Sequence, residues 1–235
     1  MNGQSKRAVK ETSVTNNERW SAVDDYFTRT IIGEDKALEA ALAANAAAGL
    51  PDIGVSAPLG KMLHLLARMA GARNALEIGT LGGYSSIWIA RALPPDGRLI
   101  TLEANEAHAA VARENIARAS LSEKAEVRVG PALESLPKIE AEGIAPFGFV
   151  FIDADKSNNA NYLSWALRLS RPGTAIVVDN VVRDGAIIRK TASSPDVVGV
   201  RRMFDLIAQE PRLSATAIQT VGGKGWDGFA LAVVV

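Results

Sequence analysis

Two apolar segments of the chain end abruptly in charged or amide side chains. In FIDADK, residues 151–156, the apolar run ends at Asp153, and Lys156 follows three residues later. In VVDN, residues 177–180, the apolar run ends at Asp179 and Asn180. Carboxylates are costly to place beside an apolar core, so these endings indicate side chains with a chemical role. If the two segments are neighbouring parallel strands, two carboxylates and one amide oxygen converge at the same edge of a sheet.

Oxygen ligands of this kind suit Mg²⁺, Mn²⁺ or Ca²⁺, and a divalent cation would relieve the repulsion between the two acids. Spacing alone leaves a second interpretation open, in which the acids are independent strand-end caps and Asp179-Asn180 begins an ordinary turn. Lys156 also has two interpretations. Close to a divalent cation its ammonium form is disfavoured, so its amine could accept a hydroxyl proton; otherwise it is a salt-bridge partner of Asp153 or Asp155.

A glycine-rich turn follows an earlier apolar segment. ALEIGTLGGYSS, residues 75–86, places Gly79, Gly82 and Gly83 between a strand and a helix, where the backbone can approach a ligand closely. The spacing is not GxGxxG, the dinucleotide fingerprint, and a tight connection without a ligand is the alternative. RLITLE then ends in Glu103, an acid placed to accept both hydroxyls of an adenosine ribose, or else a solvated cap of the next helix.

These residues need a sheet to position them, and the sequence predicts one. From Ser56 to residue 180, short apolar segments alternate with helical ones, a pattern typical of a parallel sheet with helices on both faces. A helix at about 196–209 precedes two further strands, which flank the Gly-rich segment 222–228 and indicate a C-terminal hairpin. Before the sheet, residues 18–48 favour helices.

Composition limits the function. Lys plus Arg equals Asp plus Glu at 26 each, so we expect a small-molecule partner and neither nucleic acid nor a membrane. The chain has no cysteine and only His64 and His108, so any metal must be held by oxygen. The polar start and the lack of an apolar run near ~20 residues favour a cytoplasmic protein. We expect a flexible tail over 1–18 and one domain over 19–235, with a helical cap at about 19–54.

Together these motifs resemble the cation-dependent class I O-methyltransferases, the group of catechol and caffeoyl-CoA O-methyltransferases and their bacterial relatives. The resemblance covers about Val55 to Gly185 and rests on EIGTLGGYS, Glu103, GPALESL, DADK and DN. It implies a Rossmann-like, seven-stranded, mostly parallel sheet whose last strand is antiparallel, and a homodimer. It also implies methyl transfer from S-adenosylmethionine to a phenolic or catechol-type hydroxyl, with a divalent cation, most often Mg²⁺.

Site residues follow from the same resemblance. Asp153, Asp179 and Asn180 would ligate the cation, and Lys156 would be the base. The residues implied for the S-adenosylmethionine site are Glu77, Gly79, Tyr84, Ser85, Glu103, Ala132 and Asp153.

Two positions depart from the family pattern. Leu59 stands where relatives often carry an acid, and Asn159 stands where they often carry a tyrosine. Two other functions therefore stay open at this point: a non-catalytic binding protein on the same fold, and a nicotinamide-dependent oxidoreductase.

Overall fold

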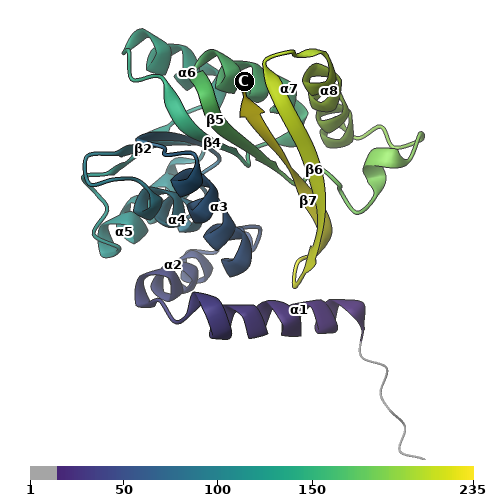
Figure 1. The fold of residues 1–235 in the computed structure, drawn as a ribbon. Coiled ribbons are helices and arrows are strands. Elements are labelled where there is room, and N and C mark those ends of the chain that lie inside the picture. The colour runs from purple at the N-terminus through teal and green to yellow at the C-terminus, as the bar shows by residue number, and fades with distance from the viewer. Residues whose placement is uncertain (1–14) are drawn as a thin grey trace, which may run out of the picture.

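A single seven-stranded sheet organises the computed structural model, which describes residues 15–235 (Figure 1). Its strand order is β3-β2-β1-β4-β5-β7-β6. The strands are β1 (Asn74–Ile78), β2 (Arg98–Glu103), β3 (Ala125–Val129), β4 (Phe147–Ile152), β5 (Ser170–Asp179), β6 (Leu213–Gly222) and β7 (Gly225–Val234). The order reverses direction at β1, and ligands of open α/β sheets bind at such a point, outside the carboxyl ends of the strands.

Pairing within the sheet confirms the predicted topology. The five strands β1 to β5 pair in parallel, while β7 runs antiparallel to both β5 and β6. Ile152 pairs with Val178, so β4 and β5 end side by side and their next residues are Asp153 and Asp179. The register therefore delivers the two acids to one edge of the sheet.

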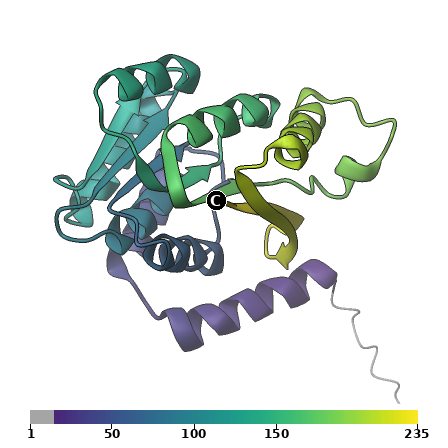
Figure 2. The ribbon, with the colours of Figure 1, turned by 45° about the horizontal axis from the view of Figure 1, so that its top comes forward.

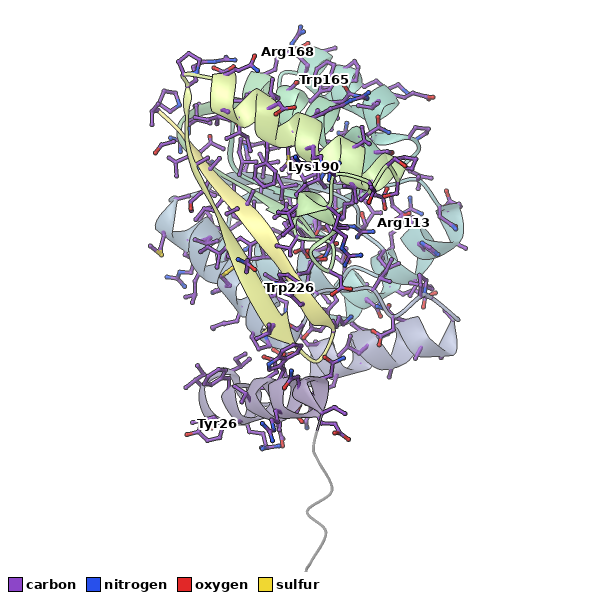
Figure 3. All side chains as sticks on the ribbon, turned by 90° about the vertical axis from the view of Figure 1, so that its right-hand side faces the viewer. Tyr26, Arg113, Trp165, Arg168, Lys190 and Trp226 are labelled. Atoms are coloured by element: carbon purple, nitrogen blue, oxygen red, sulfur yellow. The ribbon has the colours of Figure 1, made fainter. Side chains whose placement is uncertain are left out.

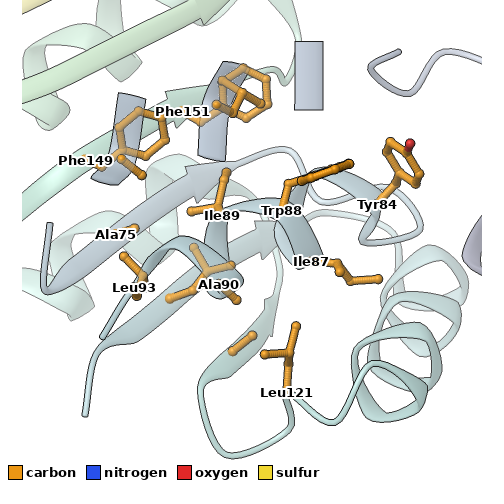
Figure 4. Packing of buried hydrophobic residues seen from close by; sticks show 14 of the residues in the cluster. Ala75, Tyr84, Ile87, Trp88, Ile89, Ala90, Leu93, Leu121, Phe149 and Phe151 are labelled. Atoms are coloured by element: carbon orange, nitrogen blue, oxygen red, sulfur yellow. The ribbon is translucent and has the colours of Figure 1, made fainter. Parts of the chain in front are cut away.

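Helices cover both faces of the sheet. They are α1 (Asn16–Phe27), α2 (Lys36–Ala47), α3 (Ala57–Met69), α4 (Tyr84–Ala92), α5 (Glu106–Arg118), α6 (Ala132–Ala141), α7 (Asn159–Arg168) and α8 (Pro195–Gln209). Because strand side chains alternate between faces, Phe149 and Phe151 pack towards α3 and α4 (Figure 4), whereas Val150 and Ile152 pack towards α7. Two buried clusters thus hold the strand ends rigidly in place.

The two ends of the described chain differ from expectation in detail. Residues 1–14 of the predicted tail lie outside the described residues, but α1 already begins at Asn16, because Thr15 and Glu18 form a capping box. At the other end, strand β7 begins at Gly225, so the predicted 222–228 turn shrinks to the tip of a long hairpin. That tip extends from the sheet to α1 (Figure 2), where the Gly223 amide donates to Asp24 Oδ2 at 3.1 Å.

Among the described residues, no helix is both long enough and apolar enough to cross a membrane.

Candidate functional site

A cavity of about 970 Å³ follows the carboxyl edge of the sheet. Its wall takes residues from the end of each parallel strand in sheet order: Gly130 after β3, Glu103 on β2, Gly79 after β1, Asp153 after β4 and Asn180 after β5. Neighbouring strands lie about 4.8 Å apart, so this row extends over about 19 Å, which suits an elongated ligand or two ligands end to end.

Glycines shape the turn at the centre of this row. Gly79 and Gly83 have φ values of +102° and +79°, which other L-residues rarely adopt. A side chain on Gly79 would also overlap the backbone of Asp153 on the neighbouring strand. Helix α4 then begins at Tyr84 without a side-chain cap, and both Tyr84 and Ser85 line the cavity. Its first amide groups are therefore available to a negatively charged ligand group.

Glu77 does not line the cavity, although the resemblance implied it as a cofactor contact. Its carboxylate is completely buried and accepts hydrogen bonds from Ser85 and Thr101, each at 2.6 Å, and from Ser86. Burial raises the pKa of Glu77 to about 7, and the three hydroxyl donors oppose that rise. Its hydrogen bonds to Ser85 and Ser86 fix the start of α4.

Glu103 lies on the cavity wall as predicted. Its Oε2 accepts from the Leu81 amide at 2.7 Å and its Oε1 from the Asn105 amide at 2.9 Å. A carboxylate has about four acceptor positions, so capacity remains on both oxygens for two further donors such as ribose hydroxyls. His108 also lines the cavity, and its Nδ1 lies 3.7 Å from Glu103 Oε1.

Front helix α2 contributes to the same wall, which the sequence did not indicate. Asn45 lies against Gly82, where an added Cβ would overlap the Asn45 carboxamide. Asn115 of α5 donates to Asn45 Oδ1 at 2.9 Å and to the Gly82 carbonyl at 2.8 Å, joining the two helices to the glycine turn. Residues 50–55, which follow α2, complete this side of the cavity.

The two acids at the ends of β4 and β5 are both withdrawn from solvent. Asp179 is 7% exposed, and its burial together with the negative charge of Asp153 raises its pKa to about 7. Burial likewise raises the pKa of Asp153, although the charges of Lys156 and Lys224 oppose this. A buried carboxylate and a half-buried one that destabilise each other's ionised form are a favourable environment for a cation.

Lys156 lies directly beside this pair. It is 6% exposed, and its Nζ donates to Asp153 Oδ1 at 2.6 Å. The salt-bridge interpretation is therefore realised in this structure. The proton-acceptor interpretation requires an uncharged Nζ that has left Asp153, and Lys156 lines the cavity in which such an amine would act.

Asn180 provides the amide oxygen. Its backbone has φ +57°, and its amide donates to Asp179 Oδ1 at 2.8 Å, whereas no hydrogen bond within residues 15–235 fixes its side chain. In that same range, no group of three His, Cys, Asp or Glu side chains is arranged to hold a metal ion. A cation at this site would therefore depend on Asn180 as the third protein ligand, which agrees with the two-acid, one-amide donor set.

Two cationic residues complete the cavity near Asn180. Arg183 pairs with Asp196 at 3.1 Å, and Lys224, at the hairpin tip, donates to Asp52 at 3.0 Å. Arg183 follows the DN motif by three residues, a position that suits either a solvated loop residue or a contact to an acidic substrate. No sequence signal could have found Lys224, because the length of the hairpin brings it to the cavity.

The two departures from the family pattern lie off the cavity wall. Leu59 is half-buried and packs against the core on the α3 side. Asn159 is completely buried, and neither polar atom of its carboxamide has a hydrogen-bond partner among the described residues. Neither substitution removes a group from the cavity.

Comparison with known proteins gives a consistent result. The family model described as O-methyltransferase matches residues 30–232. The chain is 54% identical over 212 residues to the catechol O-methyltransferase of Mycobacterium tuberculosis (strain ATCC 25618 / H37Rv), covering 90% of this chain and 94% of that protein. It is 50% identical over 219 residues to the catechol O-methyltransferase of Niastella koreensis, covering 93% and 99%.

Solved structures extend the comparison. The O-methyltransferase from Bacillus cereus in complex with SAH (S-adenosylhomocysteine) matches with a TM-score of 0.92 at 58% identity, covering 93% of this chain and 100% of that one. TomG from Streptomyces achromogenes, an O-methyltransferase involved in tomaymycin synthesis, was solved with SAM (S-adenosylmethionine) and matches with a TM-score of 0.91 at 50% identity, covering 94% and 100%.

Proposed function

Because the chain belongs to the O-methyltransferase family and is an S-adenosylmethionine-dependent O-methyltransferase, we propose that its acceptor is a catechol-type hydroxyl and that a divalent cation assists the transfer. The observation that carries this proposal is the buried acid pair, Asp153 and Asp179, with Lys156 on one acid and Asn180 beside the other. The catechol acceptor is supported by the names of the two relatives. A nicotinamide oxidoreductase and a non-catalytic protein are set aside, since the relatives are O-methyltransferases.

On the donor side, the residues of the cavity bind and orient S-adenosylmethionine. Glu103 accepts the ribose hydroxyls, and Ala132 and Gly130 lie on the adenine side of the row. The uncapped start of α4 receives the carboxylate of the methionine moiety, with Tyr84 and Ser85 on the wall and Glu77 holding Ser85 in place. This arrangement turns the sulfonium methyl group towards the acid pair.

On the acceptor side, Lys156 removes the proton of the reacting hydroxyl at its Nζ, and the resulting phenolate oxygen displaces the thioether from the methyl carbon. Asp153, Asp179 and Asn180 would hold the cation. When bound, a divalent cation would supply Lewis-acid stabilisation of the phenolate. Alignment of donor and acceptor by the protein can contribute up to ~10 kcal/mol in favourable systems.

A direct assay tests the reaction. Purified protein with S-adenosylmethionine, catechol and MgCl₂ is expected to form the monomethyl ether, and EDTA is expected to abolish the product signal in mass spectrometry. Lys156→Met should lower kcat by about 10²–10⁴-fold, the range typical of general acid–base groups. Lys138→Met, which changes an exposed side chain of α6, is the matched control. Undiminished turnover in EDTA and in Lys156→Met would contradict the proposed mechanism.

We further propose that the protein is a homodimer through the outer face of α1. No residue of α1 is buried, yet Tyr26 is 57% exposed and Ile31, in the π-helical turn that follows, is 74% exposed (Figure 3 labels Tyr26). A helix without a buried face gains little from its own chain, so a second copy would supply the missing contact.

A further inference from the structure

Arg183 and Lys224 lie at the acceptor end of the cavity, and the proposed reaction uses neither. Both line the same cavity as Asp153, Lys156 and Asn180. Both also line a second cavity of about 670 Å³ that opens between α1 and the hairpin, with Trp20 and Trp226 on its wall. The two residues therefore stand between the reaction cavity and this second cavity, at the outer boundary of the acceptor end.

Backbone contacts hold these two cations in place. Arg183 is three residues beyond Asn180, and its amide and that of Val182 donate to Asp227 Oδ1 at 3.1 and 2.9 Å. Lys224 lies at the tip of the hairpin. Strand β7 of this hairpin pairs with β5, and Phe229 is the partner of Asp179. Gly225 is four residues closer to the tip than Phe229, so the tip extends about 13 Å past the end of β5. It carries Lys224 out over the cavity, and Figure 3 shows Trp226 on the same hairpin.

The present partners of these cations can be replaced. Asp52 is 96% exposed at its side chain, and Asp196 is 41% exposed, so their ion pairs with Lys224 and Arg183 lie in solvent. Exposed pairs of this kind contribute little to stability, so an incoming carboxylate can replace Asp196 or Asp52, while Lys224 Nζ also donates to the Gly54 carbonyl. Asp227 is different, because its Oδ1 already accepts from three backbone amides, including that of Gly228.

The remaining charges limit the size of the anion. Asp52 and Asp196 lie on the first cavity, and Asp184 and Asp227 on the second. A polyanion such as a nucleotide diphosphate would meet these four acids, whereas a single carboxylate needs only one cation. Arginine suits a carboxylate in particular, because its planar guanidinium can donate two parallel hydrogen bonds to it.

We propose that the acceptor is a catechol that carries a carboxylate, and that Arg183 and Lys224 bind this carboxylate. This inference rests on the proposed function, since it assumes a catechol in the reaction cavity. Trp226 borders the outer part of the path, with its Nε1 held by Gln219 at 3.0 Å. The ring of the acceptor would then point its hydroxyls at Lys156 and its carboxylate outwards.

The experiment compares two acceptors of nearly equal shape, 3,4-dihydroxybenzoate and neutral 3,4-dihydroxybenzamide. We expect kcat/KM to be at least about tenfold higher for the carboxylate, a difference of about 1.4 kcal/mol. Arg183→Met and Lys224→Met should each reduce this preference several-fold, chiefly by raising KM for the carboxylate. Lys190→Met, in the same loop but off both cavities, is the matched control and should keep the full preference.

Calorimetric binding of both compounds, with S-adenosylhomocysteine and MgCl₂ present, separates the possible failures. Turnover of both acceptors with equal kcat/KM would overturn the carboxylate site and leave the methyl transfer standing. A carboxylate preference in binding that disappears in Arg183→Met, without turnover of either compound, would support the site and remove the proposed reaction. A preference that survives in both Arg183→Met and Lys224→Met would also overturn the assignment.

Discussion

At the scale of single residues, the burial of Glu77 makes the stability of the protein depend on pH. Its carboxylate has no solvent exposure, and burial raises its pKa from 4.5 to about 7. The folded protein therefore retains a proton that the unfolded chain releases between these values. The resulting stability is fully present below about pH 4.5, decreases as the pH rises, and is lost above about pH 7.

Glu77→Gln is expected to remove this pH dependence. The interval between the two pKa values corresponds to a change of at most about 3 kcal/mol in the free energy of unfolding. Urea unfolding at pH 5 and pH 7.5 should show a smaller decrease for Glu77→Gln than for wild type. Glu123→Gln, on an exposed residue, is the control. Equal decreases in all three proteins would show that Glu77 is not protonated in the folded state.

Residues directly at strand ends were predictable, and others were not. Asp153, Asp179 and Glu103 end or follow apolar segments, so the order of elements alone brought them to one edge of the sheet. The burial of Glu77 could not be read from the sequence, because it depends on the hydroxyls of α4 and β2 that surround its side chain. Lys224 depends on how far a hairpin reaches, which is a tertiary distance that residue types do not encode.

At the scale of elements, α2 is a wall of the donor site. Its Asn45 occupies the space that a side chain on Gly82 would need, and Asn115 of α5 links both. The sequence predicted helices over 18–48 ahead of the sheet but did not indicate that α2 lines the cavity, because helical composition does not reveal which surface a helix packs on. The alternation of strands and helices from Ser56 onwards, by contrast, was sufficient for the sheet itself.

Gly82→Ala is expected to weaken binding of S-adenosylhomocysteine, because its methyl group would displace Asn45 and the turn. A loss of roughly tenfold in Kd corresponds to about 1.4 kcal/mol, measured by calorimetry. A double variant tests whether the overlap with Asn45 is the reason for this loss. Gly82→Ala combined with Asn45→Ala should recover most of the affinity, while Asn45→Ala alone should change the affinity little. A double variant no better than Gly82→Ala would exclude the contact with α2 as the reason.

At the scale of the whole molecule, the exposed face of α1 predicts self-association. A chain of 24.8 kDa should elute with about twice that mass in size-exclusion chromatography with light scattering. Tyr26→Glu combined with Ile31→Glu should shift the protein to monomer, whereas Ile188→Glu, on another exposed apolar side chain, should not. A monomeric wild-type protein at micromolar concentration would contradict a dimer through α1.

The loop after β5 has a wider consequence. Asn180, Arg183 and Asp184 have φ values of +57°, +55° and +51°, which glycine adopts freely and other residues adopt at a cost of roughly 1–2 kcal/mol each. Glycine at position 183 would relieve this cost, yet it would erase the guanidinium that we propose binds the carboxylate of the acceptor. Under that proposal, resistance to heat and discrimination between acceptors oppose each other in this segment.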